Sequence, residues 1–268
     1  MLRSLSSALL VAAIAVPLQA QRADFTWSKA LAAGGTVSIH NINGNIKVIP
    51  STSGKVEVLG YKHGSSSATD HLKVEVNESS RGVNVCVVMD DSDSGCDDNG
   101  YHSSSRNGWF GNRHSRDWDD AEMRLEVAVP ANLTVRPSTV SGDISVDGAH
   151  GDISASSVSG DIEIEHVHAT SLKLSTVSGD IDARVDEITG NGDFSFHSVS
   201  GDLTLTVPRA FSADLSMTTV SGDIDSDFPI TLGNGRMSRR SMNARIGSGG
   251  RRLDVSTVSG DLKLRMSK

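Results

Sequence analysis

The chain has 268 residues, and 33 acidic against 25 basic side chains give it a net charge of −8. This acidity argues against nucleic acid as a partner and against simple electrostatic binding to anionic lipid. Aromatic residues make up only 4 % of the chain. A compact sandwich of this size would usually need more of them in its core, whereas a thin stack of Val, Ile and Leu would not.

Residues 1–20 resemble a secretory signal peptide. Arg3 supplies a positive charge, Ala8 to Val16 form a short apolar run, Pro17 breaks it, and Ala20 is a small residue at a plausible cleavage point. The run is shorter than the ~20 residues that span a bilayer. We therefore expect an exported protein, periplasmic or extracellular, rather than a chain that begins with a buried helix.

Residues 21–268 are expected to form a single β-repeat domain without a transmembrane segment. In its first half, four short stretches alternate apolar and polar residues, which is typical of strands with one buried face. They are Asn43–Val48, Ser53–Val58, Leu72–Val76 and Val83–Val87.

Cys86 and Cys96 are the two cysteines of the chain. In an oxidising compartment, an even number of cysteines ten residues apart favours one local disulfide. Two free thiols or half of a metal site are the alternatives, and the metal site lacks the Cys-x-x-Cys spacing.

A polar insertion at residues 90–120 interrupts the strands. Carboxylates at alternate positions can bind calcium, but no Glu closes an EF-hand loop, so a solvated acidic loop is favoured. The calcium candidates around Cys96 are Asp90, Asp91, Asp93, Asp97 and Asp98. The same insertion carries aromatic residues beside basic ones, which could contact a partner or a glycan or cover an end of the fold: Trp109, Phe110, Trp118, His102, His114, Arg113 and Arg116.

Six copies of Val-Ser-Gly-Asp occupy the second half of the chain. They begin at Val140, Val158, Val177, Val199, Val220 and Val258. A period near 20 residues is typical of stacked repeats. We therefore predict an all-β, stacked-strand β-solenoid, similar to a β-helix. A β-sandwich of hairpins is the alternative, because Ser-Gly and Gly-Asp also suit two-residue hairpin turns.

The repeated residues suit a turn between two strands. Gly tolerates positive φ, while Ser and Asp side chains can bond nearby backbone N–H groups. We expect the Val before the turn and the Ile or Leu after it to point inward. The predicted turn residues are Ser141, Gly142, Asp143, Ser159, Gly160, Asp161, Ser178, Gly179, Asp180, Ser200, Gly201, Asp202, Ser221, Gly222, Asp223, Ser259, Gly260 and Asp261.

Stacked turns would place the aspartates in a column. Carboxylates about 5 Å apart repel by roughly 0.8 kcal/mol at the dielectric constant of water. The favoured interpretation is that each Asp caps its own turn. A row of calcium sites between rungs is the alternative, although the repeats hold less Gly and Asp than known calcium-binding nonapeptides.

Two further groups are candidate sites. His166 and His168 are expected on one strand face, where they could bind a transition metal, but no third ligand is evident. An Arg- and Gly-rich insertion at residues 233–252 could bind phosphate or an acidic polymer, with a flexible solvated loop as the favoured alternative. Its arginines are Arg236, Arg239, Arg240, Arg245, Arg251 and Arg252.

The last motif lies close to the end of the chain, and solenoid ends expose unpaired strand edges. We expect the C-terminal rung to be the place where oligomers or partners dock end to end. Lys263, Arg265 and Lys268 could protect its edge.

The tandem Ser/Thr-Val-Ser-Gly-Asp-Ile/Leu motif, at Thr139–Ile144, Thr176–Ile181, Thr219–Ile224 and Thr257–Leu262, resembles a bacterial β-strand-repeat family of unknown function. That family is known as "putative adhesin" or Toastrack, and the segment Gly249–Asp261 is similar to its usual last rungs. The resemblance implies an exported or membrane-linked protein with stacked β rungs and no assigned catalytic residues.

No nucleophile elbow, paired zinc motif or phosphate loop is present, and residues that recur with a repeat are usually architectural. The sequence therefore favours a non-enzymatic cell-envelope or adhesion protein that needs no cofactor and presents a surface to a protein or glycan. A calcium-stabilised scaffold is the alternative, and a carbohydrate-active enzyme is the least favoured.

Overall fold

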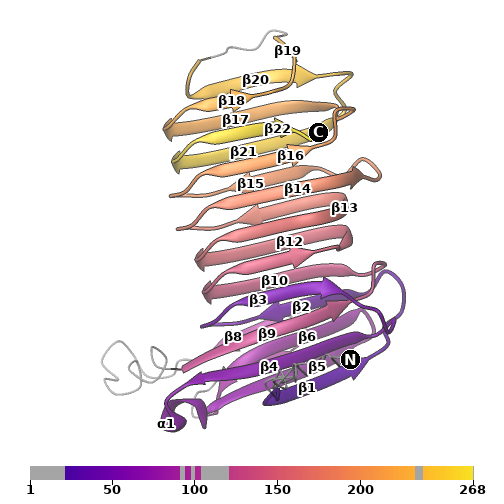
Figure 1. The fold of residues 1–268 in the computed structure, drawn as a ribbon, viewed down its shortest axis with the longest axis vertical. Helices are drawn as coiled ribbons and strands as arrows, with labels where there is room; N and C mark the ends of the chain where they lie inside the picture. Colours follow the sequence, from indigo (N-terminus) through magenta and orange to yellow (C-terminus); the bar gives the residue numbers. More distant parts are fainter. Residues whose placement is uncertain (1–21, 91–93, 98–99, 104–120, 233–237, 268) are drawn as a thin grey trace, which may run out of the picture.

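The computed structural model describes residues 22–90, 94–97, 100–103, 121–232 and 238–267. The predicted signal peptide lies outside these residues. The fold is all-β apart from one helical turn, α1 (Ser66–Thr69), and a 20-stranded sheet wraps into an elongated stack (Figure 1). The predicted stacked-strand solenoid is confirmed.

The strands of the first half, which lie toward one end of the stack, are β1 (Phe25–Lys29), β2 (Thr36–His40), β3 (Ile46–Pro50), β4 (Val56–Gly64), β5 (Leu72–Ser79), β6 (Gly82–Met89), β7 (Ser94–Asp97), β8 (Gly100–Ser103) and β9 (Ala121–Val129). The four alternating stretches of the sequence correspond to β3, β4, β5 and β6. The strands β7 and β8 form a separate two-stranded sheet within the polar insertion.

The strands of the second half are β10 (Thr134–Ser141), β11 (Ile144–Asp147), β12 (His150–Ser159), β13 (Ile162–Ser175), β14 (Ile181–Ile188), β15 (Phe194–His197), β16 (Leu203–Val207), β17 (Ala213–Ser221), β18 (Ile224–Ser226), β19 (Ile230–Thr231), β20 (Ser241–Ile246), β21 (Arg251–Ser259) and β22 (Leu262–Met266).

The large sheet consists of two strips of strands that face each other across a narrow core. The first strip runs in the order β5, β6, β2, β10, β12, the second half of β13, β15, β21, β17, β20 and β19. The second runs in the order β1, β4, β9, β3, β11, the first half of β13, β14, β16, β22 and β18.

A rung of the stack is one strand of the first strip, a motif turn, and one strand of the second strip. Neighbouring rungs pair in parallel and in register, so that Ile144, Ile162 and Ile181 lie in one inward column. All three are buried, as the period-two alternation predicts. Because the motif strands pair in parallel across rungs, the alternative of a sandwich of hairpins is wrong.

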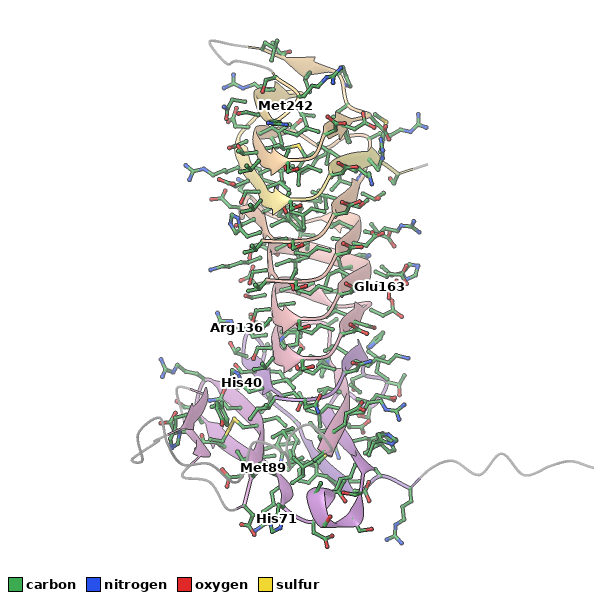
Figure 2. All side chains as sticks on the ribbon, turned by 90° about the vertical axis from the view of Figure 1, so that its left-hand side faces the viewer. His40, His71, Met89, Arg136, Glu163 and Met242 are labelled. Atoms are coloured by element: carbon green, nitrogen blue, oxygen red, sulfur yellow. A yellow bond between two sulfur atoms is a disulfide. The ribbon has the colours of Figure 1, made fainter. Side chains whose placement is uncertain are left out.

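Side chains that alternate with the core residues point to solvent. Arg136 on the first strip and Glu163 on the second project from opposite sides of the stack (Figure 2). The core between the strips is built almost wholly from aliphatic side chains, with Phe194 and Phe196 as its largest fully buried residues. This thin core explains how so few aromatic residues suffice.

At the N-terminal end, strand order in space departs from strand order in the chain. The strand β9 lies between β3, to which it is parallel, and β4, to which it is antiparallel. On the other strip, β6 pairs in parallel with β2 and antiparallel with β5. Antiparallel strands therefore close this end of the parallel stack.

The C-terminal end shows the same departure. The strand β21 pairs in parallel with both β15 and β17, and β22 pairs with both β16 and β18. The last rung of the chain is thus an inner rung of the stack. The expectation that the C-terminal rung offers a free docking edge is wrong, because strands cover it on both sides.

The true end of the stack is covered by residues from the predicted Arg- and Gly-rich insertion. Within residues 233–252, β20 pairs antiparallel with β17, and β19, which precedes the insertion, pairs with β20. Of the insertion's described residues, 238–252, Ser241–Ile246 form this capping strand and Arg251 and Arg252 begin β21. The insertion is therefore not a solvated loop throughout.

The predicted disulfide between Cys86 and Cys96 is present, with its Cα atoms 5.7 Å apart. It joins β6 in the large sheet to β7 in the small one, at the N-terminal end of the stack (Figure 2). Cys86 is buried, so the bond fastens the small hairpin to the core strip.

Candidate functional site: the motif edge

The motif turns stack along one corner of the molecule, which we call the motif edge. It comprises Val140–Asp143 and the equivalent residues of the other five copies. Each motif glycine has a φ between +138° and +153°. A Cβ on Gly201 would lie 2.0 Å from the carbonyl oxygen of Gly179 in the next rung. Only glycine both adopts this positive φ without strain and leaves room for the backbone of the neighbouring rung. The motif glycines therefore allow the turns to pack closely along the edge.

The motif valines point outward, and the expectation that they point inward is wrong. Their exposed fractions lie between 47 % and 61 %. Alternation explains the difference, because the Ser or Thr before each Val takes the inward position instead. Among the described residues, the exposed large apolar side chains are Val140, Val158, Val177, Val199, Val220, Val258 and Leu232.

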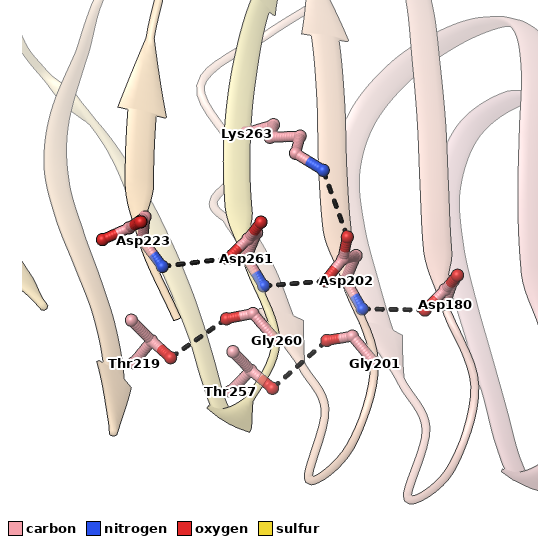
Figure 3. A network of polar contacts seen from close by, with 9 residues as sticks. All are labelled: Asp180, Gly201, Asp202, Thr219, Asp223, Thr257, Gly260, Asp261 and Lys263. Atoms are coloured by element: carbon pink, nitrogen blue, oxygen red, sulfur yellow. Dashed lines mark hydrogen bonds and ion pairs between the residues drawn. The ribbon is translucent and has the colours of Figure 1, made fainter. Parts of the chain in front are cut away.

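The buried hydroxyl residues were missed as a functional part of the motif. Each donates a hydrogen bond to the carbonyl oxygen of the turn glycine in the neighbouring rung on the N-terminal side of the stack. Thr219 bonds Gly260 at 3.0 Å and Thr257 bonds Gly201 at 3.3 Å (Figure 3). The series is completed by Thr139, Ser157, Thr176 and Ser198. Their recurrence before every Val was the available signal.

The aspartates form a ladder between rungs. In each case Oδ1 accepts a hydrogen bond from the backbone N–H of the aspartate in the next rung, as Asp180 does from Asp202 at 2.8 Å (Figure 3). The favoured interpretation was that each Asp caps its own turn. It is wrong about the hydrogen-bond donor, because the backbone N–H that each carboxylate accepts belongs to the turn of the neighbouring rung. The other aspartate-to-aspartate bonds range from 2.7 to 3.0 Å.

The ladder continues into the rung of β2 and β3, where the motif is replaced by Asn41–Ile46. There Asn45 Oδ1 accepts from the backbone N–H of Asp143 at 2.8 Å. Asn41 takes the place of the buried Thr and donates to the carbonyl oxygens of Gly44 and Met123. An amide oxygen thus serves the ladder as well as a carboxylate does.

Asp202 differs from the other motif aspartates in having a basic partner among the described residues. Lys263 Nζ lies 3.1 Å from its Oδ2. The backbone N–H of Asp261, together with Lys263, holds the pKa of Asp202 below its ordinary value of 3.8. The repulsion expected along the column is offset here by these donors.

The calcium candidates of the polar insertion are placed only in part. Asp90 forms an ion pair with Lys73, and Asp97 lies 3.8 Å from His102 Nδ1. Asp91, Asp93 and Asp98 lie outside the described residues, as do Trp109, Phe110, Arg113, His114, Arg116 and Trp118. Within the part of the chain that the structure describes, no three His, Cys, Asp or Glu side chains form a metal-binding group.

The two predicted histidines have separate partners. His166 Nδ1 lies 3.0 Å from Asp147, which raises the pKa of the imidazole. His168 stacks on His150, with ring centroids 4.3 Å apart, and lies 3.5 Å from Glu187. The strand is irregular between Ile164 and His168, so simple alternation does not describe this segment.

The arginines of the second insertion do not form a common site. Arg251 is 8 % exposed, donates to the carbonyl oxygens of Thr170, Gly190 and Gly192, and lies 4.6 Å from the centre of the Phe194 ring. Burial lowers its pKa.

The other arginines have different surroundings. Arg245 pairs with Asp214, and Arg239, Arg240 and Arg252 are exposed. Arg236 lies outside the described residues.

Two clefts lie away from the motif edge. One of about 530 Å³ is bordered by Asp186, Glu187, Phe211 and Arg251, and one of about 370 Å³ by Leu59, Glu57 and Glu126. No described helix is long and apolar enough to cross a membrane.

The fold and the edge define a protein of stacked β rungs whose turns repeat one motif. A family model described as Toastrack DUF4097 matches residues 102–265, which is more than half of the chain. The chain therefore belongs to the Toastrack DUF4097 family.

Two solved structures are similar to this chain. A "putative cell adhesion protein" from Clostridium sporogenes has a TM-score of 0.49 and 8 % identity, covering 91 % of this chain and 99 % of the other. A "putative adhesin" from Bacteroides fragilis has a TM-score of 0.44 and 16 % identity, covering 90 % and 96 %. No curated protein matches the sequence.

Proposed function

We propose that this is a non-enzymatic, exported, adhesin-like protein of the cell envelope that presents the motif edge to a protein or glycan partner. The observation that carries the proposal is the column of six exposed valines on rungs locked together by backbone and side-chain ladders. Exposed apolar groups that form a continuous surface are typical of interaction sites. A rigid surface also loses little conformational entropy when it binds.

The test is saturable binding of the labelled protein to isolated cell envelopes. The variant Val158→Lys with Val177→Lys places two charges in the middle of the edge, and we expect it to weaken binding about tenfold or more. The control Ser154→Lys with Lys173→Ser alters the first strip away from the edge and keeps the net charge. Protease and periodate treatment of the envelopes then separates a protein partner from a glycan.

Absence of saturable binding, or equal binding by both variants, would contradict the proposal. The calcium-stabilised scaffold remains the second candidate for this chain, and melting measured with calcium and then with chelator tests it. Since one oxygen of each ladder carboxylate already accepts a backbone N–H, we expect little change in the melting temperature.

A further inference from the structure

We propose that the partner of the motif edge is a cationic amphipathic helix. Its apolar side chains would lie on the valine column, and its Lys or Arg side chains on the aspartate column. The inference rests on the proposed function, because it names the class of partner for the same surface. Four features of the edge support it.

The first feature is an inversion of burial within each rung. Thr176 is 4 % exposed, whereas Val177 beside it is 47 % exposed. Strand propensity alone does not require this arrangement, because Thr is β-branched as well and would suit the outward position. The apolar residue nevertheless stands outside in six motif rungs, where its methyl groups are available to another molecule.

The second feature is the charge beside the valines. The motif places one carboxylate per rung at Asp143, Asp161, Asp180, Asp202, Asp261 and Asp223, in that order along the stack. Each of the first five uses Oδ1 in the ladder, which leaves Oδ2 to face solvent or a basic group. Of these six aspartates, only Asp202 has a basic partner among the described residues. A partner with positive charge would relieve the repulsion along this column.

The third feature is the spacing of the rungs, about 4.8 Å, which is the distance between paired strands. An α-helix laid along the edge repeats its face every ~5.4 Å, so it drifts by about 0.6 Å per rung, or about 3 Å over the five spacings between the six motif rungs, which is less than one rung. An extended strand repeats its face only every ~6.8 Å and drifts out of register sooner. The edge therefore fits a helix better than an extended peptide.

The fourth feature is that the edge does not suit a second copy of itself. In each rung the valine lies on the side of the turn that faces the first strip, and the aspartate lies on the side that faces the second strip. Two edges that meet antiparallel would place one aspartate column against the other. Two that meet parallel would bury each aspartate column against valines, and both arrangements leave carboxylates without a partner.

The experiment uses the full chain and a fluorescent synthetic Leu/Lys amphipathic peptide of about 18 residues, which is about 27 Å long as a helix. Binding is followed by fluorescence anisotropy, and peptide helicity by circular dichroism. A scrambled peptide of the same composition and a Leu/Glu peptide serve as probe controls. We expect binding of the Leu/Lys peptide alone, accompanied by helix formation and weakened by salt.

Two edge variants and one matched control decide where the peptide binds. Asp143→Asn with Asp161→Asn and Asp180→Asn removes three charges, while Asn45 shows that an amide oxygen can hold the ladder. Val140→Thr with Val158→Thr and Val177→Thr removes the apolar column. Glu163→Gln, Glu165→Gln and Asp182→Asn remove three charges from the second strip instead. We expect about tenfold weaker binding for either edge variant and less than about twofold for the control.

The inference would be overturned if all three protein variants bound the Leu/Lys peptide equally. It would also be overturned if the wild-type protein bound the scrambled peptide or the Leu/Glu peptide as tightly as the Leu/Lys peptide. Melting curves first confirm that each variant is folded. If the edge variants lose envelope binding but the Leu/Lys peptide does not bind, the proposed function stands and the helix is wrong. If the peptide binds but wild-type protein does not bind envelopes, the proposed function fails instead.

Discussion

The middle and the two ends of this stack are built by different rules. From β10 to β16 the chain climbs one rung after another, so that order in the sequence is order in space. At each end a later segment enters between earlier ones: β9 between β3 and β4, and β21–β22 between the rungs of β15–β16 and β17–β18. The motif therefore specifies what a rung is, but not where it lies in the stack.

The difference follows from how the backbone N–H and C=O groups of each region find hydrogen-bond partners. In the middle, both sides of every rung are covered by identical neighbours, and the ladders repeat. At an end, one side would expose unpaired backbone groups, which invites association with other strands. The antiparallel strands β4 and β5 at one end and β20 at the other change the pairing direction and interrupt the repeat.

The largest effect is expected from ending the chain at residue 250, which removes β21 and β22. The inner position of this rung means that two interfaces are lost. Leu253, Val255, Leu262 and Leu264 are buried. At about 1.5–3 kcal/mol each, their loss amounts to at least about 6 kcal/mol, comparable with the stability of a typical domain. We expect residues beyond β16 to become susceptible to limited proteolysis.

The matched comparison is removal of β1, which pairs on one side only, with β4. Its Phe25 and Trp27 are only partly buried, so a smaller loss of stability is expected. A truncation at residue 250 that leaves the melting temperature and proteolysis unchanged would mean that β21–β22 does not lie inside the stack.

A second comparison uses two glycines with positive φ. Gly201 in the ladder has no room for a Cβ, whereas Gly54, in the turn between β3 and β4, has no atom within 4 Å of that position. We expect Gly201→Ala to cost about 3 kcal/mol or more, because it adds a clash with backbone to conformational strain. Gly54→Ala should cost about 1 kcal/mol, from strain alone. Denaturant unfolding measures both, and equal costs would contradict the close rung contact.

A third comparison concerns two arginines near the inserted rung. Arg251→Met removes a buried guanidinium that serves three carbonyl groups, and we expect a loss of about 2–4 kcal/mol. Arg245→Met breaks an exposed ion pair with Asp214 and should cost less than about 1 kcal/mol. A smaller effect at Arg251 than at Arg245 would show that the buried contacts do not hold β21 in place.

The smallest effect is expected on acidification. The folded pKa of Asp202 is lowered below 3.8, first by the backbone N–H of Asp261 and then by Lys263. The carboxylate therefore contributes stability above its ordinary pKa and loses it as the pH falls through the lower folded value. Asp202→Asn should flatten the decline of the melting temperature below pH ~4. An unchanged pH profile would contradict the contribution of this carboxylate.

Much of the fold could be predicted from the sequence, for local reasons. Period-two alternation identified β3, β4, β5 and β6, and the motif spacing identified the stacked turns. The disulfide followed from two nearby cysteines in a chain that the sequence predicts to be exported. Strand order at the ends could not be predicted, because β21 and β22 have the same motif as every other rung and would fit equally well at the end of the stack.

The candidate site was predicted in its residues but not in its contacts. The motif indicated a column of aspartates, yet their bonds run to the next rung, a relation that no single turn contains. The outward valines were missed because apolar residues beside a turn were assumed to be core. Counting inward positions forward from Val135 would have placed Thr139 inside and Val140 outside.

The position of the last rung also has a consequence for the time course of folding. A chain made from its N-terminus presents β17, β18 and β20 before β21 and β22. The rungs β15–β16 and β17–β18 are therefore made before the rung β21–β22 that lies between them. The stack cannot close until β21 and β22 arrive and pair on both sides at once. Its long-range pairings further slow this step. Completion of the fold is therefore set by β21 and β22, which follow both of their flanking rungs in the chain.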